Sequence, residues 1–509
     1  MSKSFRFILG ILLALLALTA GFFWFYAPYP ARQEFHQAAN PRQIISTSPA
    51  PPQKAGYYDT VWPSEHADLW RSHAALNAGL PANFAPDQLA VASASLNLPV
   101  WTYTRAKDEV FVIGGSPFSL DGFTQSIAAG KALDRFQSLT SIAADLFNGT
   151  KPYLAKINPL TMQVSQLDLT EGTTVNYTGG LLMHQNGYVY AVAQSVLYKI
   201  DPQSMQIVQS LKLPLVGNAL EHYWTTYNGL QVLASGELVL KGFDILDSAK
   251  VPGFLLLVDP DDLHKDAQQQ AFVSSARLTI QQSAGSPTYL YHVNATDSLR
   301  FKITNTGFEL DSAWSRVYRI ASAPSTQASS PLLFGGIGQV VFADNTAPGA
   351  TTPLKLYTQP VEASHLPATL YGSPAFSESL PGFNFFMVAG DPYITQLLIY
   401  YDPINNLVSA NRVTAEGGLE PVWERNGYKV SASPALVPDR DLLYIDNYQN
   451  GKDHLVVLKL STGEELASVE LSATLPTIGT IVPGMNNDVT ITSSETGRPS
   501  GLITRIYVP

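Results

Sequence analysis

Side chains that could exchange protons occur at three places in the sequence. Glu221 and His222 are adjacent, His365 lies in a turn, and Glu424 stands next to Arg425. An imidazole near a carboxylate is a common pairing for general acid–base catalysis. We therefore take Glu221, His222, His365 and Glu424 as candidate catalytic residues.

Aromatic and polar side chains near these groups indicate a ligand-binding surface. Rings beside charged groups suit a ligand that has both apolar and polar parts. The same residues have structural interpretations as well: a packed loop, a solvent-exposed histidine, a salt bridge or a core position. The candidate ligand-binding residues are Tyr177, Trp224, His292, Trp423 and Arg425.

Several chemistries that leave a sequence signature are missing. The chain has no Gly-x-Ser-x-Gly motif, no phosphate-binding glycine loop and no His-Glu-x-x-His motif. It has no cysteine, which excludes thiolate catalysis and cysteine-bound metals. Residues 259–262 are acidic but lack the alternating ligands and the glycine of a calcium loop, so we interpret them as a solvated turn. We predict no metal site, and the cofactor is unknown from the sequence.

The elements that must position these residues are repeated β-hairpins. Each repeat is an alternating apolar run, a turn built on Asn, Asp or Ser, and a second alternating run. Such repeats at intervals of about 40–60 residues predict the blades of a β-propeller. The clearest copies are residues 154–164, 197–208 and 397–408, and looser ones are 255–260 and 455–463.

A Ser-Pro pair recurs at a nearly constant distance before the hairpins. It stands at the start of an expected strand at Ser330, Ser373 and Ser433. Ser373 precedes the turn at Asp402 by 29 residues, and Ser433 precedes the turn at Ser461 by 28. Proline is tolerated at the first residue of a strand, where no ladder hydrogen bond is lost. We interpret each Ser-Pro strand as the channel-lining strand of a blade and each hairpin as its last two strands.

Ser-Pro-Ala at the start of a strand, followed by hairpins like Leu-Tyr-x-x-Asp-x-x-Thr-Gly, resembles the quinoprotein-like (PQQ-like) β-propeller superfamily; residues 433–468 match best. The resemblance implies an all-β ring of four-stranded antiparallel blades. We expect seven blades, with eight as the alternative, and residues 478–508 completing an eighth blade or closing the ring. The tryptophan that often follows the Thr-Gly turn in this family is absent near Val208, Ala410 and Ala467, which puts quinone binding in doubt.

In a ring of this kind, the loops that precede the channel-lining strands all reach one rim. The expected phase of the repeats puts Tyr177, residues 221–224, His365 and residues 423–425 in these loops. We therefore predict that they converge at one mouth of the channel.

The N-terminus predicts a membrane anchor. Lys3 and Arg6 precede an uncharged apolar run over residues 7–26, close to the ~20 residues that cross a bilayer as a helix. The run ends in aromatic residues, which favours an uncleaved anchor in the inner membrane with the rest of the chain in the periplasm. A signal peptide cleaved near Ala20 is the alternative.

The expected domain organisation follows from these segments. Residues 1–26 form the anchor or signal peptide, and residues 27–56 are a tether rich in Pro and Gln. Residues 57–98 are a helical lead-in with a helix at 64–77, stopped by Gly79 and Pro81. Residues 99–509 form the propeller, with a helical insertion at 125–147.

Composition narrows the function without deciding it. The net charge of −10 argues against nucleic acid as a partner. One hypothesis is a membrane-tethered periplasmic propeller that binds a protein or another envelope ligand at its channel mouth. The alternative is a propeller-type hydrolase, lactonase or quinone-dependent dehydrogenase acting at that mouth. Whether the protein is an enzyme stays open at this point.

Overall fold

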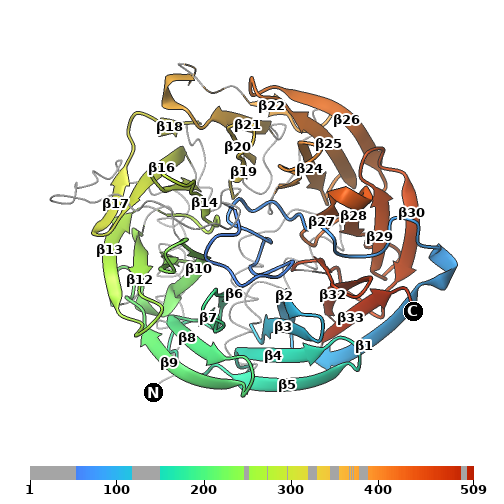
Figure 1. Ribbon diagram of the computed structural model, residues 1–509, viewed down its shortest axis with the longest axis horizontal. Helices are drawn as coiled ribbons and strands as arrows, with labels where there is room; N and C mark the ends of the chain where they lie inside the picture. Colours follow the sequence, from blue (N-terminus) through green and yellow to red (C-terminus); the bar gives the residue numbers. More distant parts are fainter. Residues whose placement is uncertain are drawn as a thin grey trace, which may run out of the picture.

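The computed structural model describes residues 53–116, 150–219, 221–245, 251–271, 273–294, 296–318, 330–343, 355–365, 367, 370, 372–377, 388–477, 479–494 and 501–509. In this part of the chain, the strands form eight antiparallel sheets arranged as the blades of a ring (Figure 1). The predicted all-β propeller is confirmed. The number of blades is eight, which was the alternative, and not seven.

Each blade is a four-stranded meander. From the innermost strand outward, blades 1 to 4 are β2 (Pro99–Ala106), β3 (Glu109–Gly114), β4 (Tyr153–Asn158), β5 (Gln163–Asp168); β6 (Thr178–Met183), β7 (Val189–Ala193), β8 (Val196–Asp201), β9 (Gln206–Lys212); β10 (Thr225–Val232), β11 (Leu238–Asp244), β12 (Gly253–Val258), β13 (Lys265–Ala271); β14 (Thr279–Gln281), β15 (Tyr289–Val293), β16 (Asp297–Thr304), β17 (Gly307–Leu310). In blade 4 a short fifth strand, β18 (Arg316–Val317), also pairs with β16.

Blades 5 to 8, in the same order, are β19 (Leu332–Phe334), β20 (Gln339–Ala343), β21 (Lys355–Pro360), β22 (Ser373–Pro374); β23 (Ala389–Gly390), β24 (Leu397–Asp402), β25 (Leu407–Val413), β26 (Leu419–Asn426); β27 (Ala435–Val437), β28 (Leu442–Asp446), β29 (His454–Lys459), β30 (Glu465–Glu470); β31 (Val482–Pro483), β32 (Asp488–Ser494), β33 (Gly501–Tyr507), β1 (Ala90–Leu96). The described helices are short 3-10 turns: η1 (Pro86–Gln88), η2 (His222–Trp224), η3 (Ala363–His365) and η4 (Pro438–Arg440).

The last blade is built from both ends of the described chain. Strands β31 to β33 come from the C-terminal end, and β1 adds the outermost strand by pairing with β33 from Ala90↔Tyr507 to Leu96↔Gly501. Residues 478–508 therefore contribute to an eighth blade and to the closure of the ring. The propeller begins before residue 99, the boundary that we expected.

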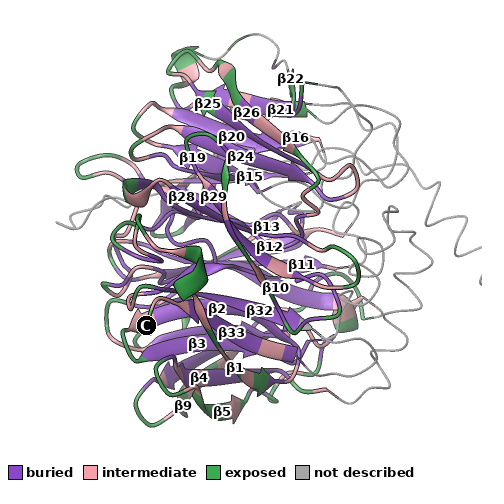
Figure 2. Cartoon of the chain, turned by 90° about the vertical axis from the view of Figure 1, so that its right-hand side faces the viewer, coloured by how far each residue is buried: buried purple, intermediate pink, exposed green. Residues whose placement is uncertain are grey.

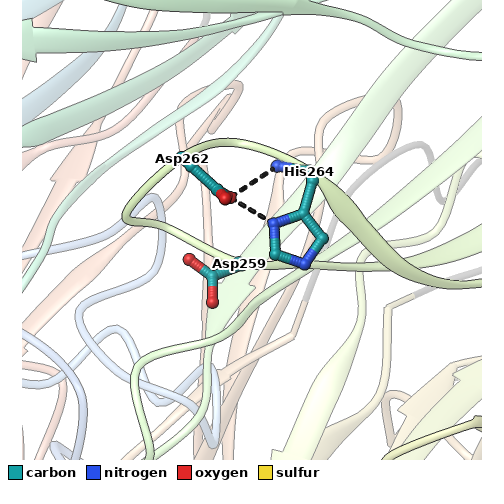
Figure 3. Close-up of side chains that lie close together, drawn as sticks. All are labelled: Asp259, Asp262 and His264. Carbon is teal, nitrogen blue, oxygen red and sulfur yellow. Dashed lines mark hydrogen bonds and ion pairs between the residues drawn. The ribbon is translucent and has the colours of Figure 1, made fainter.

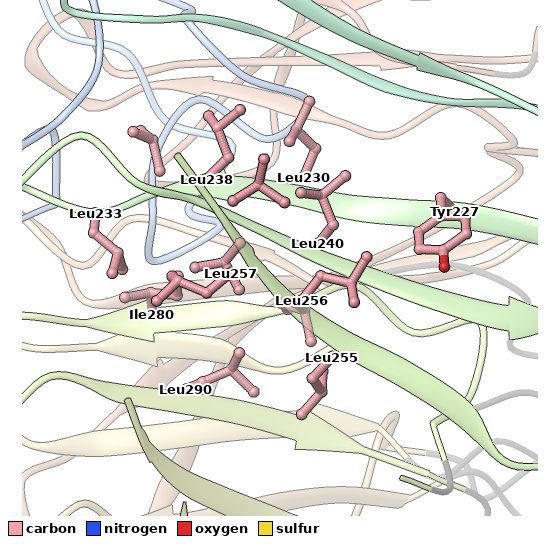
Figure 4. Close-up of a cluster of buried hydrophobic side chains, with 14 of the residues drawn as sticks. Tyr227, Leu230, Leu233, Leu238, Leu240, Leu255, Leu256, Leu257, Ile280 and Leu290 are labelled. Atoms are coloured by element: carbon pink, nitrogen blue, oxygen red, sulfur yellow. The ribbon is translucent and has the colours of Figure 1, made fainter. Parts of the chain in front are cut away.

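Most strands are buried on both faces because each blade is covered by its two neighbours, as the purple strands in Figure 2 show. Leu255, Leu256 and Leu257 of β12 are consecutive and all buried, which requires apolar contacts on both sides of the sheet. They belong to a cluster with side chains of the neighbouring blades, including Leu290 (Figure 4). Where two innermost strands approach, a Cβ on Gly179 would lie 1.7 Å from the carbonyl oxygen of Tyr227, so only glycine fits.

Residues 53–80, which we call the plug, fill the centre of the ring (the dark blue chain in Figure 1). Plug carbonyl groups accept hydrogen bonds from the innermost strands of six blades. The donors are the N–H groups of Thr104, Met183, Ile280, Leu333, Gly390 and Leu436, at 2.8–3.1 Å from Trp62, Pro63, Leu69, Trp70, Ser72 and His73. A seventh contact joins the N–H of Gly79 to the carbonyl of Gly484 in blade 8.

The helix predicted at residues 64–77 is wrong. Ala67, Arg71, His73 and Asn77 all have φ between 55° and 71°, a left-handed conformation that a helix of L-residues does not contain. Carbonyl groups of this segment accept hydrogen bonds from the surrounding blades, and several of its N–H groups bond within the plug through turns, not through a helical ladder. The residues expected to form a separate lead-in are therefore part of the propeller.

Every innermost strand begins on the same face of the ring, because a four-stranded blade returns the chain to the side where it started. We call this the incoming face, and the opposite side the exit face. Both ends of the plug lie at the exit face: the Gly56 carbonyl accepts from Gln185 in the β6–β7 turn, and Asn77 donates to Asp439 in η4. The predicted anchor (7–26) and the insertion (125–147) lie outside the described residues. No helix of the described chain has the length and apolar character needed to cross a bilayer.

Candidate functional site

The incoming face carries four of the predicted site residues. Tyr177 precedes β6, and Glu221, His222 and Trp224 precede β10, as expected. The two loops are joined by a hydrogen bond of 2.7 Å from the Val175 N–H to the Tyr223 carbonyl.

These loops present aromatic rings at the incoming face. Tyr177 and Trp224 both pack against Val175. Tyr223 and Trp224 meet edge to face, with ring centroids 5.1 Å apart, and Tyr223 is 37% exposed. The carboxylate of Glu221 stabilises its own loop, because it accepts a hydrogen bond of 2.6 Å from the Asn218 N–H.

The other predicted residues lie elsewhere, so the predicted convergence of the whole set is wrong. Trp423, Glu424 and Arg425 belong to β26, the outermost strand of blade 6. The Trp423 indole N–H donates to the Leu460 carbonyl at 2.8 Å, and Arg425 donates to two carbonyls of the neighbouring β29–β30 turn. Both side chains therefore hold blades 6 and 7 together.

Glu424, His365 and His292 also lie away from the incoming loops of blades 2 and 3. Glu424 accepts hydrogen bonds from the N–H and hydroxyl of Ser377, both at 2.8 Å. His365 lies in η3, between the third and outermost strands of blade 5. His292 is fully buried on β15, where its Nε2 accepts from the Ser274 N–H at 3.1 Å.

The misplacement arises because the strands expected in blade 6 are one position off from the observed strand order. The hairpin around Asp402 is β24–β25, the second and third strands, whereas the hairpins at Asp201 and Ser461 join the third and fourth. Ser330 and Ser433 do lie directly before innermost strands, but Ser373 opens β22, the outermost strand of blade 5. Any pair of adjacent strands gives the same hairpin pattern, so the pattern alone does not fix the strand number.

Behind the aromatic loops, the plug meets blade 4 through a buried ion pair. The Arg277 Nε donates to both oxygens of the Glu65 carboxylate at 2.8 Å, and its Nη2 lies 2.7 Å from Oε1. The guanidinium lies over the Trp101 ring, 5.5 Å from the centroid, and its Nη1 donates to the Tyr177 hydroxyl at 3.4 Å. A continuous polar contact thus runs from the plug to the incoming face.

The electrostatic environment determines the protonation states of Glu65 and Arg277. Burial would raise the pKa of Glu65, but the charge of Arg277, together with the interactions with His66 and the hydrogen bond from Arg277, outweighs it and lowers that pKa well below its usual range. For Arg277, burial would lower the pKa, but the charge of Glu65 and the hydrogen bonds to Glu65 and Tyr177 together raise it instead. Both groups are therefore charged at all physiological pH values, and each neutralises the other.

The loop that carries Arg277 is held by Lys241 from blade 3 and by Ser330 before blade 5. The Lys241 ammonium donates to the carbonyls of Ser274 and Ala276, and the Arg277 N–H donates to the Ser330 hydroxyl at 2.7 Å. Burial, assisted by the charge of Arg277, lowers the pKa of Lys241 well below its usual value. The loop is preorganised, because its backbone groups have partners from several blades.

Two imidazoles in contact complete the centre of the channel. The ring centroids of His66 and His73 are 4.3 Å apart with the rings tilted by 38°, and the Trp101 ring meets His66 edge to face at 6.2 Å. Burial lowers the pKa of His66 to about 3 and that of His73 well below 6.5, so both are neutral at pH 7.

The channel residues do not fit a quinone cofactor of the kind implied by the family resemblance. Such a site needs carboxylates for a calcium ion and a basic clamp for the cofactor's acids. Here Glu65 and Arg277 are already committed to each other, and Lys241 donates to backbone carbonyls. We derive no chemical step through that group.

Among the described residues, the carboxylate and histidine atoms close enough to hold a metal ion belong to Asp259, Asp262 and His264, within 4.8 Å of one another (Figure 3). They lie in the β12–β13 turn on the exit face. The His264 Nδ1 bonds Asp262 and its Nε2 lies 2.8 Å from Asp266. The hydrogen bond to Asp262 raises the pKa of His264. The three side chains lie on a turn where His264 contacts two carboxylates.

Sequence reasoning missed Glu65, Arg277 and Trp101. A signal for Arg277 exists: it stands two residues before an innermost strand in a chain with only 14% charged residues. Glu65 carries no such signal, because its position depends on the path of the plug.

No family model matches the chain, and no curated protein matches it in sequence. Solved structures resemble it in fold. The quinohemoprotein alcohol dehydrogenase from Comamonas testosteroni aligns with a TM-score of 0.54 at 10% identity, over 87% of this chain and 80% of that one. The quinohemoprotein alcohol dehydrogenase ADHIIG from Pseudomonas putida HK5 aligns with a TM-score of 0.52 at 11% identity, over 88% and 80%. These similarities show a shared fold alone, and function does not follow from fold.

Proposed function

We propose that this chain is a membrane-tethered periplasmic β-propeller that binds a protein or another envelope ligand at the incoming face, through Tyr177, Tyr223 and Trp224. The observation that supports this most directly is the plug. Residues of the chain itself fill the ring and bond to the innermost strands of six blades. The surface offered to a ligand is then the rim of loops around the plug.

The position of the plug also supports the orientation of the propeller. Its first residues lie among the exit-face turns, where the side-chain amide of Gln282 donates to the Ala55 carbonyl at 3.2 Å. A tether formed by the preceding residues would leave from this face. The exit face is then turned to the inner membrane and the incoming face to the periplasm.

The enzyme alternative is a hydrolase, lactonase or quinone-dependent dehydrogenase, and it needs catalytic groups in contact. No hydrogen bond joins any two of Glu221, His222, His365 and Glu424, although all four lie in the described chain. Glu221 and Glu424 accept hydrogen bonds from their own surroundings instead. Ligand binding is the function that this arrangement favours.

Site-specific photocrosslinking in intact cells tests the proposal. A photoreactive amino acid replaces Tyr223 on the incoming face or, as the matched control, Val208, which is 48% exposed on the outermost strand of blade 2. We expect a discrete adduct from position 223, reduced by Trp224→Ala, and none from position 208. Equal adducts at both positions, or none at 223, would contradict the proposal.

A further inference from the structure

Two fully buried carboxyl groups lie at the incoming ends of two strands in blade 7. Asp446 ends β28, and Asp453 stands directly before β29. Asp446 Oδ1 accepts from the N–H groups of Ser431 and Ala432 at 2.9 and 2.8 Å, which holds the loop that leads into β27. Asp453 Oδ2 accepts from the Thr477 N–H at 2.7 Å, which holds the loop that leads into blade 8.

The hydroxyl of Ser431 connects Asp446 to the loop that Asp453 holds. Its Oγ lies 2.5 Å from Asp446 Oδ2 and 2.6 Å from the Thr477 carbonyl oxygen. A hydroxyl has one proton to donate, and a carbonyl oxygen can only accept. If Ser431 donates to Thr477, the proton between Ser431 and Asp446 must belong to Asp446. The hydrogen-bond geometry therefore fits a neutral Asp446.

The surroundings keep that proton in place. Burial, followed by the charge of Asp453, raises the pKa of Asp446 well above its usual value, and burial raises the pKa of Asp453 to about 6. The other ionisable groups nearby either contact other partners or are neutral. Lys452 lies 3.6 Å from Glu470, the His454 ring contacts the Asn447 carbonyl, and Tyr401 and Tyr448 are uncharged phenols at neutral pH.

We propose that Asp446, Ser431, Thr477 and Asp453 form a proton-operated link between the incoming loops of blades 7 and 8. With Asp446 protonated, one chain of donors runs from its carboxyl group through Ser431 to the Thr477 carbonyl. When the proton leaves, the Ser431 hydroxyl turns to the new carboxylate and the Thr477 carbonyl loses its donor. Two like charges also appear in a buried site, so the loops separate as the pH rises.

Hydrogen–deuterium exchange of the full-length chain tests the link at about pH 5 and about pH 7.5, with exchange times scaled for the intrinsic rate. We expect peptides over residues 427–434 and 471–477 to exchange roughly 3- to 10-fold faster at the higher pH, which corresponds to the loss of one hydrogen bond. Asp446→Asn should abolish the difference, because its amide N–H donates to Ser431 at every pH.

A matched control exists on the exit face of the same blade. Asp441 accepts hydrogen bonds from the N–H and hydroxyl of Ser461, both at 2.7 Å, and Asp441→Asn should leave the pH dependence of the two loops unchanged. A wild-type chain without the difference, or Asp446→Asn with it, would overturn the proposal. If that variant fails to fold, infrared spectroscopy of the wild-type chain decides: absence of a protonated carboxyl band at about pH 5 refutes the link.

Discussion

Glu65 and Arg277 are 212 residues apart in sequence and form a bidentate ion pair at the centre of the ring. Removing one partner leaves a buried charge without compensation, which typically costs about 3–5 kcal/mol. We expect Arg277→Met and Glu65→Leu each to lower the free energy of unfolding by about that amount. The double variant should recover part of the loss, because neither charge is then left buried.

Chemical denaturation of the two single variants and the double variant measures this coupling. The control is Lys452→Met, which removes a pair with Glu470 that is 3.6 Å long and exposed; such pairs contribute about 0–1 kcal/mol. Additive losses in the double variant would show that the plug does not depend on this pair.

Stability should fall in acid because of the buried neutral histidines. The pKa is about 3 for His66 and well below 6.5 for His73 and His292, so the unfolded chain binds more protons than the folded one between these values and 6.5. The free energy of unfolding then decreases as the pH falls from 6.5, by about 1.4 kcal/mol per pH unit for each histidine.

Denaturation curves of His66→Gln at several pH values check this, since the variant removes one of the three contributions. His365→Gln is the control, because His365 is exposed. The Asp446–Asp453 pair acts in the opposite direction between pH 3.8 and about 6, since the folded chain holds protons that the unfolded chain releases. An unchanged pH slope in His66→Gln would contradict the assignment of a neutral His66.

Alanine variants of two glycines distinguish the cost of backbone strain from the cost of steric crowding. Gly56 and Gly187 have φ of 92° and 90°, but a Cβ on Gly56 would lie 2.3 Å from the Leu233 carbonyl oxygen, whereas a Cβ on Gly187 would have no neighbour within 4 Å. Both alanine variants carry the cost of positive φ, about 1–2 kcal/mol. We expect Gly56→Ala to lower the melting temperature more, and equal shifts would mean that the start of the plug adapts freely.

Trp423 and Trp224 should behave differently when truncated. Trp423 is 8% exposed and bonded to Leu460 in the next blade, so Trp423→Ala should cost about 3–5 kcal/mol of stability. Trp224 lies in the partly exposed 3-10 turn η2, so Trp224→Ala should reduce crosslinking from position 223 with little change in melting temperature. If both variants lose stability, Trp224 has a structural role and not a ligand-binding one.

The sequence predicted strands well where a blade has long alternating hairpins. The hairpins at Asn158, Asp201 and Ser461 are the third and fourth strands of their blades. The innermost strands are harder to predict. β23 and β31 have two residues each, and contacts with neighbouring segments of the chain hold them in position. The expected phase of blade 6 is therefore one strand out, and Trp423, Glu424 and Arg425 lie on an outermost strand where a loop was expected.

The centre of the ring was not predictable from local sequence. Ala67, Arg71 and His73 adopt positive φ without glycine, which local propensity does not favour. What fixes them is a set of hydrogen bonds to strands hundreds of residues further along the chain. Tyr177 and Trp224 were placed correctly because each immediately precedes an innermost strand.

The pairing of β1 with β33 makes closure of the ring depend on synthesis of the chain through residue 507. During translation β1 emerges early and stays without its partner until residues 501–507 have been made. A nascent chain interrupted before that point keeps an open sheet edge, which invites pairing with other chains. That edge alone therefore distinguishes an open ring from a closed one for chaperones and proteases.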